Sequence, residues 1–273
     1  MNASFLDTFA FAVNNPHRIQ AGFQALGQII FQKIGNIPGP KGVQIQVVFD
    51  GDFDRFHRVL LMNTGDQHSI VLWLFPLFGY LLGSIPWGVV LTRLFGSADI
   101  RQQGSGNIGA TNVSRVAGPI LGLLTFAGDI LKGAVPVYLA LKFAGQNQSV
   151  NDFFLAIVSL AAFFGHLYPL FMKFKSGGKG VATTAGCFVV LAPLACLAAL
   201  SAFIIFLVVS RRVSAGSLAA AAVLPIAGWY ATHSWEITTG AAIMSVFIFI
   251  RHTDNIKRLL AGTEPTFRDK RKS

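Results

Sequence analysis

The stretch GVATTAGCFVVLAPLACLAALSAFIIFLVVS, residues 180–210, decides the fold expected for this chain. As one helix it would be about 45 Å long, well beyond the ~30 Å hydrocarbon core of a bilayer. Pro193 lies near its middle, where a proline breaks or kinks a helix. Lys179 precedes the stretch and Arg211 follows it, and short loops rich in Lys and Arg stay in the cytoplasm. We therefore expect two short helices that cross and return, with thinning or tilt making up for their length.

The composition of the whole chain supports a membrane protein. Of its 273 residues, 53% are hydrophobic and only 12% are charged, whereas about 25% are charged in ordinary soluble domains. This excludes both a soluble domain and a disordered chain. The formal net charge of +10 would suggest nucleic acid in a soluble protein, but on an apolar chain a basic excess is typical of cytoplasmic loops. No nucleic-acid partner is expected.

Apolar segments and two kinds of connector alternate after residue 61. The candidate spans are residues 69–94, 116–143, 152–172, 180–210, 214–231 and 235–252. The connectors at 145–152 and 232–236 hold no Lys or Arg, whereas the others are basic. If all basic connectors lie on the cytoplasmic side, both ends of residues 180–210 lie there too. The segment must then cross the membrane and return, which requires the break at Pro193. The expected fold is all-α, a polytopic integral membrane protein with about seven transmembrane helices, the start of the first helix outside and the C-terminus cytoplasmic.

Residues 1–61 differ from the rest and are expected to be an atypical N-terminal extension, with residues 62–273 as the membrane-embedded domain. The extension mixes charges and has no signal-peptide layout. Under the expected topology it would have to cross the membrane ahead of the first span. The simpler hypothesis is that translation begins at Met62. Mass spectrometry of the mature N-terminus tests this, and a native chain that starts at Met1 would contradict it.

The first motif with chemistry is GSGNIGATNVSR, residues 104–115. Backbone N–H groups in Gly-rich turns and at helix N-termini bind anions, and an arginine such as Arg115 grips phosphate through paired hydrogen bonds. A Gly-rich turn alone is equally compatible with a tight cytoplasmic loop. The added hydroxyls, amides and Arg115 favour an anion site.

The second motif is GHLYPLFMKFKSGGKGVATTAG, residues 165–186, which puts Lys179 in a glycine-rich turn at the start of the next helix. That arrangement suits a phosphate. It is not a Walker loop, whose spacing differs. Lys173 and Lys175 are interpreted as positive-inside anchors. Cysteines and histidines show no metal-ligand spacing, so neither a metal nor a cofactor is expected.

The third motif is HTDNIKRLLAGTEP, residues 252–265, which directly follows the last span. His252 could transfer a proton or donate to phosphate, or it could be an interfacial histidine, and Asn255 could orient a hydroxyl. The RRVSAGS stretch adds two hydroxyls, those of Ser214 and Ser217, at the same membrane face.

Two ionisable residues, Asp129 and Lys132, lie one helical turn apart within an apolar segment. Intramembrane ions are usually paired and face inward. The spacing therefore favours a structural ion pair near the site over a catalytic one.

These three blocks, in this order, closely resemble the acyl-phosphate:glycerol-3-phosphate acyltransferase family (PlsY-type) of bacterial inner membranes, over roughly residues 72–267. The resemblance implies transfer of a fatty acyl group from acyl phosphate to the 1-position of sn-glycerol 3-phosphate, forming lysophosphatidic acid and phosphate in phospholipid biosynthesis. It also implies a multi-pass inner-membrane enzyme without a cofactor, an active site facing the cytoplasm, contact with membrane lipid, and an upstream partner that produces acyl phosphate.

The resemblance also implies roles for individual residues. The implied catalytic set is Ser105, Arg115, Lys179, His252 and Asn255. The implied substrate-binding set is Gly104, Asn107, Gly109, Thr111, Asn112, Gly177, Gly178, Ser214 and Ser217. The chain departs from the family pattern at Ser114, where an aliphatic residue is usual, at Ser176, where Gly is common, and at Arg212, where an aromatic is usual. These departures concern packing rather than the reaction.

The residues suit this chemistry independently of the resemblance. Both substrates carry phosphate, so the enzyme mainly has to hold two phosphates and direct a hydroxyl at a carbonyl. The His-Asp pair of acyl-CoA-using acyltransferases is absent from the sequence. Either His252 or the substrate phosphate therefore acts as the base. A transporter of organic phosphates is the main alternative, although the sequence shows no inverted repeat; a non-catalytic scaffold would not explain three phosphate-binding loops.

Overall fold

The computed structural model describes residues 67–96, 99–143, 148–175 and 177–267. The expectations for residues 1–61, including a translation start at Met62, lie outside the described residues.

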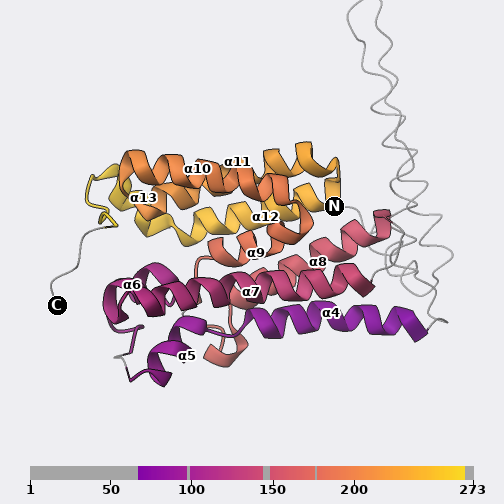
Figure 1. Cartoon of the computed structure of the whole chain (residues 1–273), viewed down its shortest axis with the longest axis horizontal. Helices are drawn as coiled ribbons and strands as arrows, with labels where there is room; N and C mark the ends of the chain where they lie inside the picture. Colours follow the sequence, from indigo (N-terminus) through magenta and orange to yellow (C-terminus); the bar gives the residue numbers. More distant parts are fainter. Residues whose placement is uncertain (1–66, 97–98, 144–147, 176, 268–273) are drawn as a thin grey trace, which may run out of the picture. The chain divides into compact units, whose positions relative to one another are not determined.

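Every regular element within the described residues is helical (Figure 1). In chain order they are α4 (Gln67–Gly83), α5 (Trp87–Leu94), α6 (Ala110–Ala117), α7 (Pro119–Phe143), α8 (Gln148–Leu167), the 3-10 turn η1 (Leu170–Met172), α9 (Val181–Leu191), α10 (Pro193–Ser210), α11 (Val213–Thr232), α12 (Trp235–Arg251) and α13 (Thr253–Leu260). The predicted all-α class is confirmed.

Four of the described helices are long and apolar enough to cross a membrane: α7, the segment Asp152–Met172, α10 and α11. The pair Leu74–Gly83 and Trp87–Leu94, bent by 47°, forms a fifth if it is one broken span. Each of the seven expected segments is helical. However, α9 has 11 residues and α12 has 17, so the count of seven passes stays a prediction.

The predicted break at Pro193 is confirmed. Helix α9 ends at Leu191, Ala192 leaves the helical region with φ −151° and ψ 78°, and Pro193 is the first residue of α10. Proline suits the first turn because the N–H it lacks would have no partner there. Only 11% of the α10 window is buried, so this helix presents most of its surface outward, as a lipid-facing helix does.

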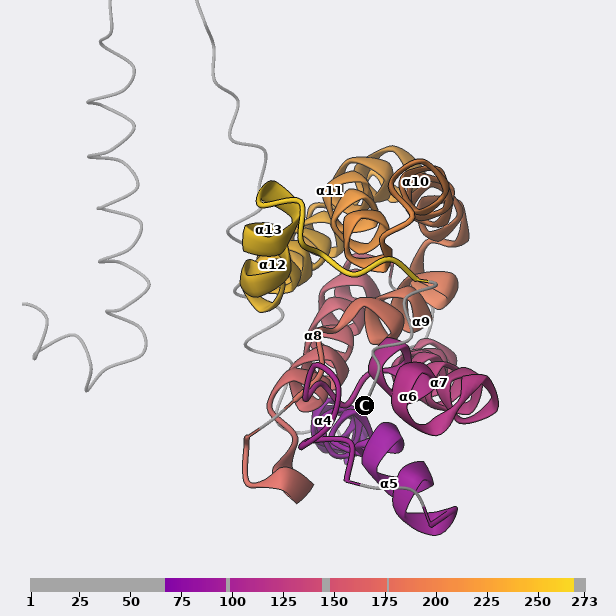
Figure 2. The ribbon, with the colours of Figure 1, turned by 90° about the vertical axis from the view of Figure 1, so that its left-hand side faces the viewer.

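Glycines allow helices α7 and α9 to pack closely. A Cβ atom on Gly133 would lie 2.3 Å from the Thr183 carbonyl oxygen, and one on Gly186 would lie 2.0 Å from the Ile130 carbonyl oxygen. Small residues are the usual device by which membrane helices approach each other. Figure 2 shows α9 between the α6–α7 pair and the α10–α11 pair. The start of α9, which Lys179 directly precedes, is thereby fixed in the interior.

Candidate active site

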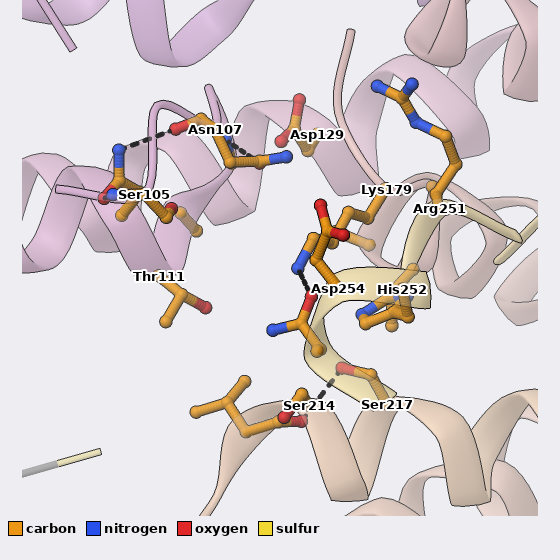
Figure 3. Close-up of a pocket in the computed structure, with 18 of the residues that line it drawn as sticks. Ser105, Asn107, Thr111, Asp129, Lys179, Ser214, Ser217, Arg251, His252 and Asp254 are labelled. Carbon is orange, nitrogen blue, oxygen red and sulfur yellow. Dashed lines mark hydrogen bonds between the residues drawn. The ribbon is translucent and has the colours of Figure 1, made fainter. Parts of the chain in front are cut away.

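A cavity of about 860 Å³ lies where the loop before α6, the start of α9, the start of α11 and the α12–α13 junction meet (Figure 3). It brings together residues from all three sequence motifs. The predicted site residues that line it are Gly104, Ser105, Asn107, Gly109, Thr111, Asn112, Arg115, Lys179, Ser214, Ser217, His252 and Asn255. Twelve of the fourteen predicted residues thus share one cavity.

Asn112 shapes the first wall of the cavity. It is 3% exposed, and its Oδ1 atom accepts a hydrogen bond from the Ser105 N–H at 2.9 Å. Its Nδ2 atom donates to the carbonyl oxygens of Gln103 at 3.0 Å and Asn107 at 2.9 Å. Gly104 has φ +61°, and a Cβ atom there would lie 2.2 Å from Asn112 Oδ1. One buried amide therefore holds the glycine-rich loop in a fixed shape.

This loop presents polar groups to the cavity. Asn107 accepts a hydrogen bond from the Gly109 N–H at 2.8 Å and so ties the loop to the start of α6. Figure 3 shows Ser105, Asn107 and Thr111 together on this wall. Arg115, in the last turn of α6, also lines the cavity, and its Nη2 atom donates to the Thr266 carbonyl oxygen at 3.3 Å. This wall carries a cation and several hydrogen-bond donors.

Lys179 carries the charge of the second wall. It precedes Gly180, whose φ of +91° places the N-cap of α9 in the left-handed region. Its Nζ atom donates a hydrogen bond to the Asn255 Oδ1 atom. Burial lowers the pKa of Lys179 to about 8, against the opposing attraction of the Glu264 carboxylate. Lys179 is therefore a cation at neutral pH but a readily deprotonated one.

His252 forms the third wall at the α12–α13 junction. It is 2% exposed, and its Nδ1 atom lies 2.8 Å from the Ile248 carbonyl oxygen. Burial, followed by the nearby charge of Lys179, lowers the pKa of His252 to about 4. The ring is therefore neutral at pH 7. Since a carbonyl only accepts, Nδ1 carries the proton, and Nε2 is left as a hydrogen-bond acceptor.

Glu264 organises the site but was not among the predicted residues. Its Oε1 atom accepts from Ser214 Oγ at 2.7 Å and Asn255 Nδ2 at 2.6 Å, and its Oε2 atom accepts from Arg258 Nε at 2.7 Å. Burial alone would raise the pKa of Glu264, but these bonds outweigh it and lower the pKa. The sequence offers no signal for this role, because Ser214 and Glu264 lie far apart along the chain.

Comparison with known proteins decides the family. A model of the family described as glycerol-3-phosphate acyltransferase matches residues 73–262, well over half of the chain. This chain belongs to the glycerol-3-phosphate acyltransferase family. It is thus an enzyme of this family, as the three sequence blocks predicted.

Relatives match the acyltransferase nearly end to end. The glycerol-3-phosphate acyltransferase of Syntrophotalea carbinolica is 50% identical over 192 residues, covering 70% of this chain and 95% of the relative. That of Trichlorobacter lovleyi is 48% identical over 189 residues, covering 69% and 94%. Both matches therefore extend over almost the whole of each relative.

Solved structures of PlsY, an integral membrane glycerol 3-phosphate acyltransferase, share the fold of this acyltransferase. The glycerol 3-phosphate form has a TM-score of 0.66 at 36% identity, covering 72% of this chain and 95% of that one. The lysophosphatidic acid form has a TM-score of 0.65 at the same identity and coverage. The predicted integral, multi-pass membrane architecture is confirmed.

Two predicted site residues of the acyltransferase, Gly177 and Gly178, do not line the cavity. Their carbonyl oxygens accept hydrogen bonds from Arg251, at 2.6 Å from Nη2 and 3.1 Å from Nε respectively. The two glycines therefore form a turn behind Lys179 and support it from outside the cavity.

The expected ion pair between Asp129 and Lys132 is present in α7, with Nζ 2.9 Å from Oδ1. The Lys132 Nζ atom also donates to the Ile85 carbonyl oxygen at 2.9 Å. Asp129 lines the cavity together with His166, which lies in the second motif but to which the sequence assigned no role. The pair therefore borders the site, and its structural role stays a prediction.

Proposed function

We propose that this acyltransferase transfers a fatty acyl group from acyl phosphate to the 1-hydroxyl of sn-glycerol 3-phosphate, giving lysophosphatidic acid and inorganic phosphate. The observation that carries the proposal is the convergence of Ser105, Arg115 and Lys179 on one cavity. Two cations on separate walls, with a hydroxyl on the same wall as Arg115, suit the binding of two phosphate groups. The glycerol 3-phosphate and lysophosphatidic acid forms of the related PlsY structures support the same acceptor and product.

The reaction needs no cofactor, because acyl phosphate is already activated. The 1-hydroxyl oxygen attacks the acyl carbonyl carbon, the bond from this carbon to the phosphate oxygen breaks, and inorganic phosphate leaves. The enzyme has to align the two substrates and stabilise the charge that develops.

The hydroxyl proton passes to a phosphate oxygen in this proposal. His252 has a pKa of about 4, whereas the second pKa of a phosphate monoester is about 6. Burial and the charge of Lys179 thus disfavour a protonated His252, and of the two bases that the sequence left open we assign the role to phosphate. Before attack the hydroxyl hydrogen points to the Nε2 atom of His252, which orients the hydroxyl oxygen. As the bond to the carbonyl carbon forms, this hydrogen turns to the phosphate oxygen and is transferred there.

An apolar groove beside the cavity suits the acyl chain. It has a volume of about 410 Å³ and lies between α11 and α12, lined by Ala221, Ala222, Pro225, Ala242, Ser245, Val246, Phe249 and Ile250. Ile250 also lines the polar cavity. A phosphate held in the cavity would therefore leave its acyl chain close to an apolar path along the helix surface.

The proposed orientation places the active site on the cytoplasmic side of the bacterial inner membrane. The basic connectors that carry Arg115, Lys179 and Arg211 support it through the positive-inside rule. Soluble glycerol 3-phosphate would then reach the cavity from the cytoplasm, and an upstream enzyme there would supply acyl phosphate. Residues 62–273 are proposed as the acyltransferase domain, which contains the family match at 73–262.

A detergent assay tests the proposed donor and product. The purified chain is given labelled glycerol 3-phosphate with either palmitoyl phosphate or palmitoyl-CoA, and lipid is extracted. We expect labelled lysophosphatidic acid in the assay with palmitoyl phosphate and none in the assay with palmitoyl-CoA. The reverse result would contradict acyl phosphate as the acyl donor. Uptake of label into sealed vesicles without any lipid product would instead support a transporter.

A further inference from the structure

His166 is a buried histidine that the proposed reaction does not use. It lies near the end of α8, is 4% exposed, and lines the cavity. Among the residues that the structure describes, no partner lies within hydrogen-bond distance of its Nδ1 atom, which is 3.6 Å from Asp129 Oδ1. Most buried polar side-chain atoms have a partner. A buried histidine with an unsatisfied ring nitrogen therefore needs an explanation other than packing.

One side of the His166 ring faces a fixed wall. Asp129 is held by its ion pair with Lys132, and Lys132 is also bonded to the Ile85 carbonyl oxygen, both at 2.9 Å. All three ionisable side chains are almost completely buried, at 4% exposure for Asp129, 2% for Lys132 and 4% for His166. Movement of the ring toward α7 would disrupt a buried ion pair, which is costly.

The other side of His166 faces the turn that precedes Lys179. The Gly178 N–H donates to the His166 carbonyl oxygen at 3.1 Å. A Cβ atom on Gly178 would lie 1.9 Å from His166 Nε2, and one on Gly177 would lie 1.8 Å from the Leu167 carbonyl oxygen. Neither glycine has a left-handed φ. Close packing against the end of α8, rather than backbone conformation, therefore requires glycine at both positions.

Arg251 holds the same turn from α12. Its guanidinium donates to the carbonyl oxygens of Gly177 and Gly178. The turn is thus held on one side by the His166 carbonyl oxygen and ring, and on the other by two hydrogen bonds from the Arg251 guanidinium. Since Lys179 directly follows Gly178, the position of this turn determines where the Lys179 ammonium group lies.

We propose that His166 is a positioning residue: its ring sets the position of the Gly177–Gly178 turn and so directs Lys179 at the substrate phosphate, while the Asp129–Lys132 pair supports the ring. This inference rests on the proposed role of Lys179 in binding glycerol 3-phosphate.

A double-mutant cycle tests the contact. Gly178→Ala, His166→Ala and their combination are assayed for the KM of glycerol 3-phosphate and for thermal stability. Each single variant should raise KM about tenfold, because displacing Lys179 would weaken one charge-assisted hydrogen bond to the substrate phosphate. In the double variant the added methyl group occupies space that the ring has left, so KM should not exceed that of His166→Ala. If the KM increases of the two single variants multiplied in the double variant, as they do for independent sites, the proposal would be overturned.

Two further variants separate positioning from simple loss of stability. His166→Leu keeps much of the ring's volume, so it should keep KM near the wild-type value and serves if His166→Ala does not fold. Gly240→Ala is the matched control, since its Cβ would lie an ordinary 3.6 Å from the Ala156 Cβ atom. A lowered Tm with unchanged KM in both His166→Ala and Gly178→Ala would overturn the proposal.

The cycle is then repeated in a Lys179→Ala background. If His166 acts through Lys179, His166→Ala should raise KM no further there. A full additional increase would contradict the proposal. If Lys179→Ala itself leaves KM unchanged, the proposed phosphate-binding role of Lys179 fails instead. The two failures are therefore distinguishable.

Discussion

Lys179, just before α9, and Asn255, in α13, are joined by a hydrogen bond from Nζ to Oδ1. The Asn255 amide donates in turn to Glu264 at 2.6 Å. Lys179 is thus connected through one amide to a buried carboxylate. The orientation of Asn255 follows from this chain, because its oxygen must face the ammonium and its nitrogen the carboxylate.

Glu264→Ala should destabilise the enzyme by about 3 kcal/mol, because Arg258, Ser214 and Asn255 all lose a buried acceptor. The Tm should fall, and the KM for glycerol 3-phosphate should rise as Asn255 loses its orientation. Thermal unfolding in detergent and steady-state kinetics measure both. Glu236→Ala, at the far end of α12, is a matched acidic control. Equal effects of the two substitutions would contradict the role of Glu264.

Lys179→Ala should raise the KM for glycerol 3-phosphate at least tenfold, since a charge-assisted hydrogen bond to phosphate contributes about 1.5–3 kcal/mol. His252→Ala should mainly lower kcat. Steady-state kinetics of the purified variants separate these effects. Lys175→Ala removes an exposed lysine from the same loop and should behave as wild type. Unchanged kinetics in both Lys179→Ala and His252→Ala would remove the assignment.

The pKa of about 8 for Lys179 predicts a pH dependence. Below this value the side chain is charged and binds phosphate; above it the charge is lost. The kcat/KM for glycerol 3-phosphate, which reports the free enzyme, should therefore fall as pH rises through about 8. Lys179→Arg keeps its charge throughout and should lack this inflection. The same inflection in the arginine variant would assign it to another group.

Asn112→Asp should weaken the enzyme although it preserves the shape of the side chain. The carboxylate cannot donate to the Gln103 and Asn107 carbonyl oxygens and would place a negative oxygen against them. We expect a lower Tm and a higher KM for glycerol 3-phosphate. Gln102→Glu adds the same charge at an exposed position of the loop. If both variants showed the same small change, the loop would not depend on Asn112.

Ala222→Phe should narrow the groove between α11 and α12 and alter chain-length preference. The kcat/KM for palmitoyl phosphate should fall about tenfold relative to octanoyl phosphate, the effect of losing contact with roughly two methylene groups. Ile226→Phe alters an exposed residue of α11 outside the groove and is the matched control. An unchanged ratio between the two donors would place the acyl chain elsewhere.

The break between α9 and α10 was predictable because it depends on local features, Pro193 and the basic residues at both ends of the run. The clustering of Ser105, Lys179 and His252 was predictable for a related reason, since each lies at an end of an apolar segment that borders one membrane face. Family resemblance then supplied their roles.

The roles of Glu264 and His166 were not predictable. Glu264 acts through Ser214 and Asn255, and its partners depend on how the chain after α13 folds back. His166 depends on the fit of its ring against Gly178, a contact between α8 and a turn that no sequence spacing encodes. For the same reason the sequence did not indicate that Gly177 and Gly178 pack against the end of α8; their role in substrate binding stays a prediction.

An experimental structure of this chain with bound glycerol 3-phosphate would test the proposed phosphate site most directly. We expect the phosphate to lie in the cavity within hydrogen-bond distance of Lys179 and the 1-hydroxyl to face His252. A phosphate bound outside the cavity, or one that contacts neither Lys179 nor Arg115, would contradict it.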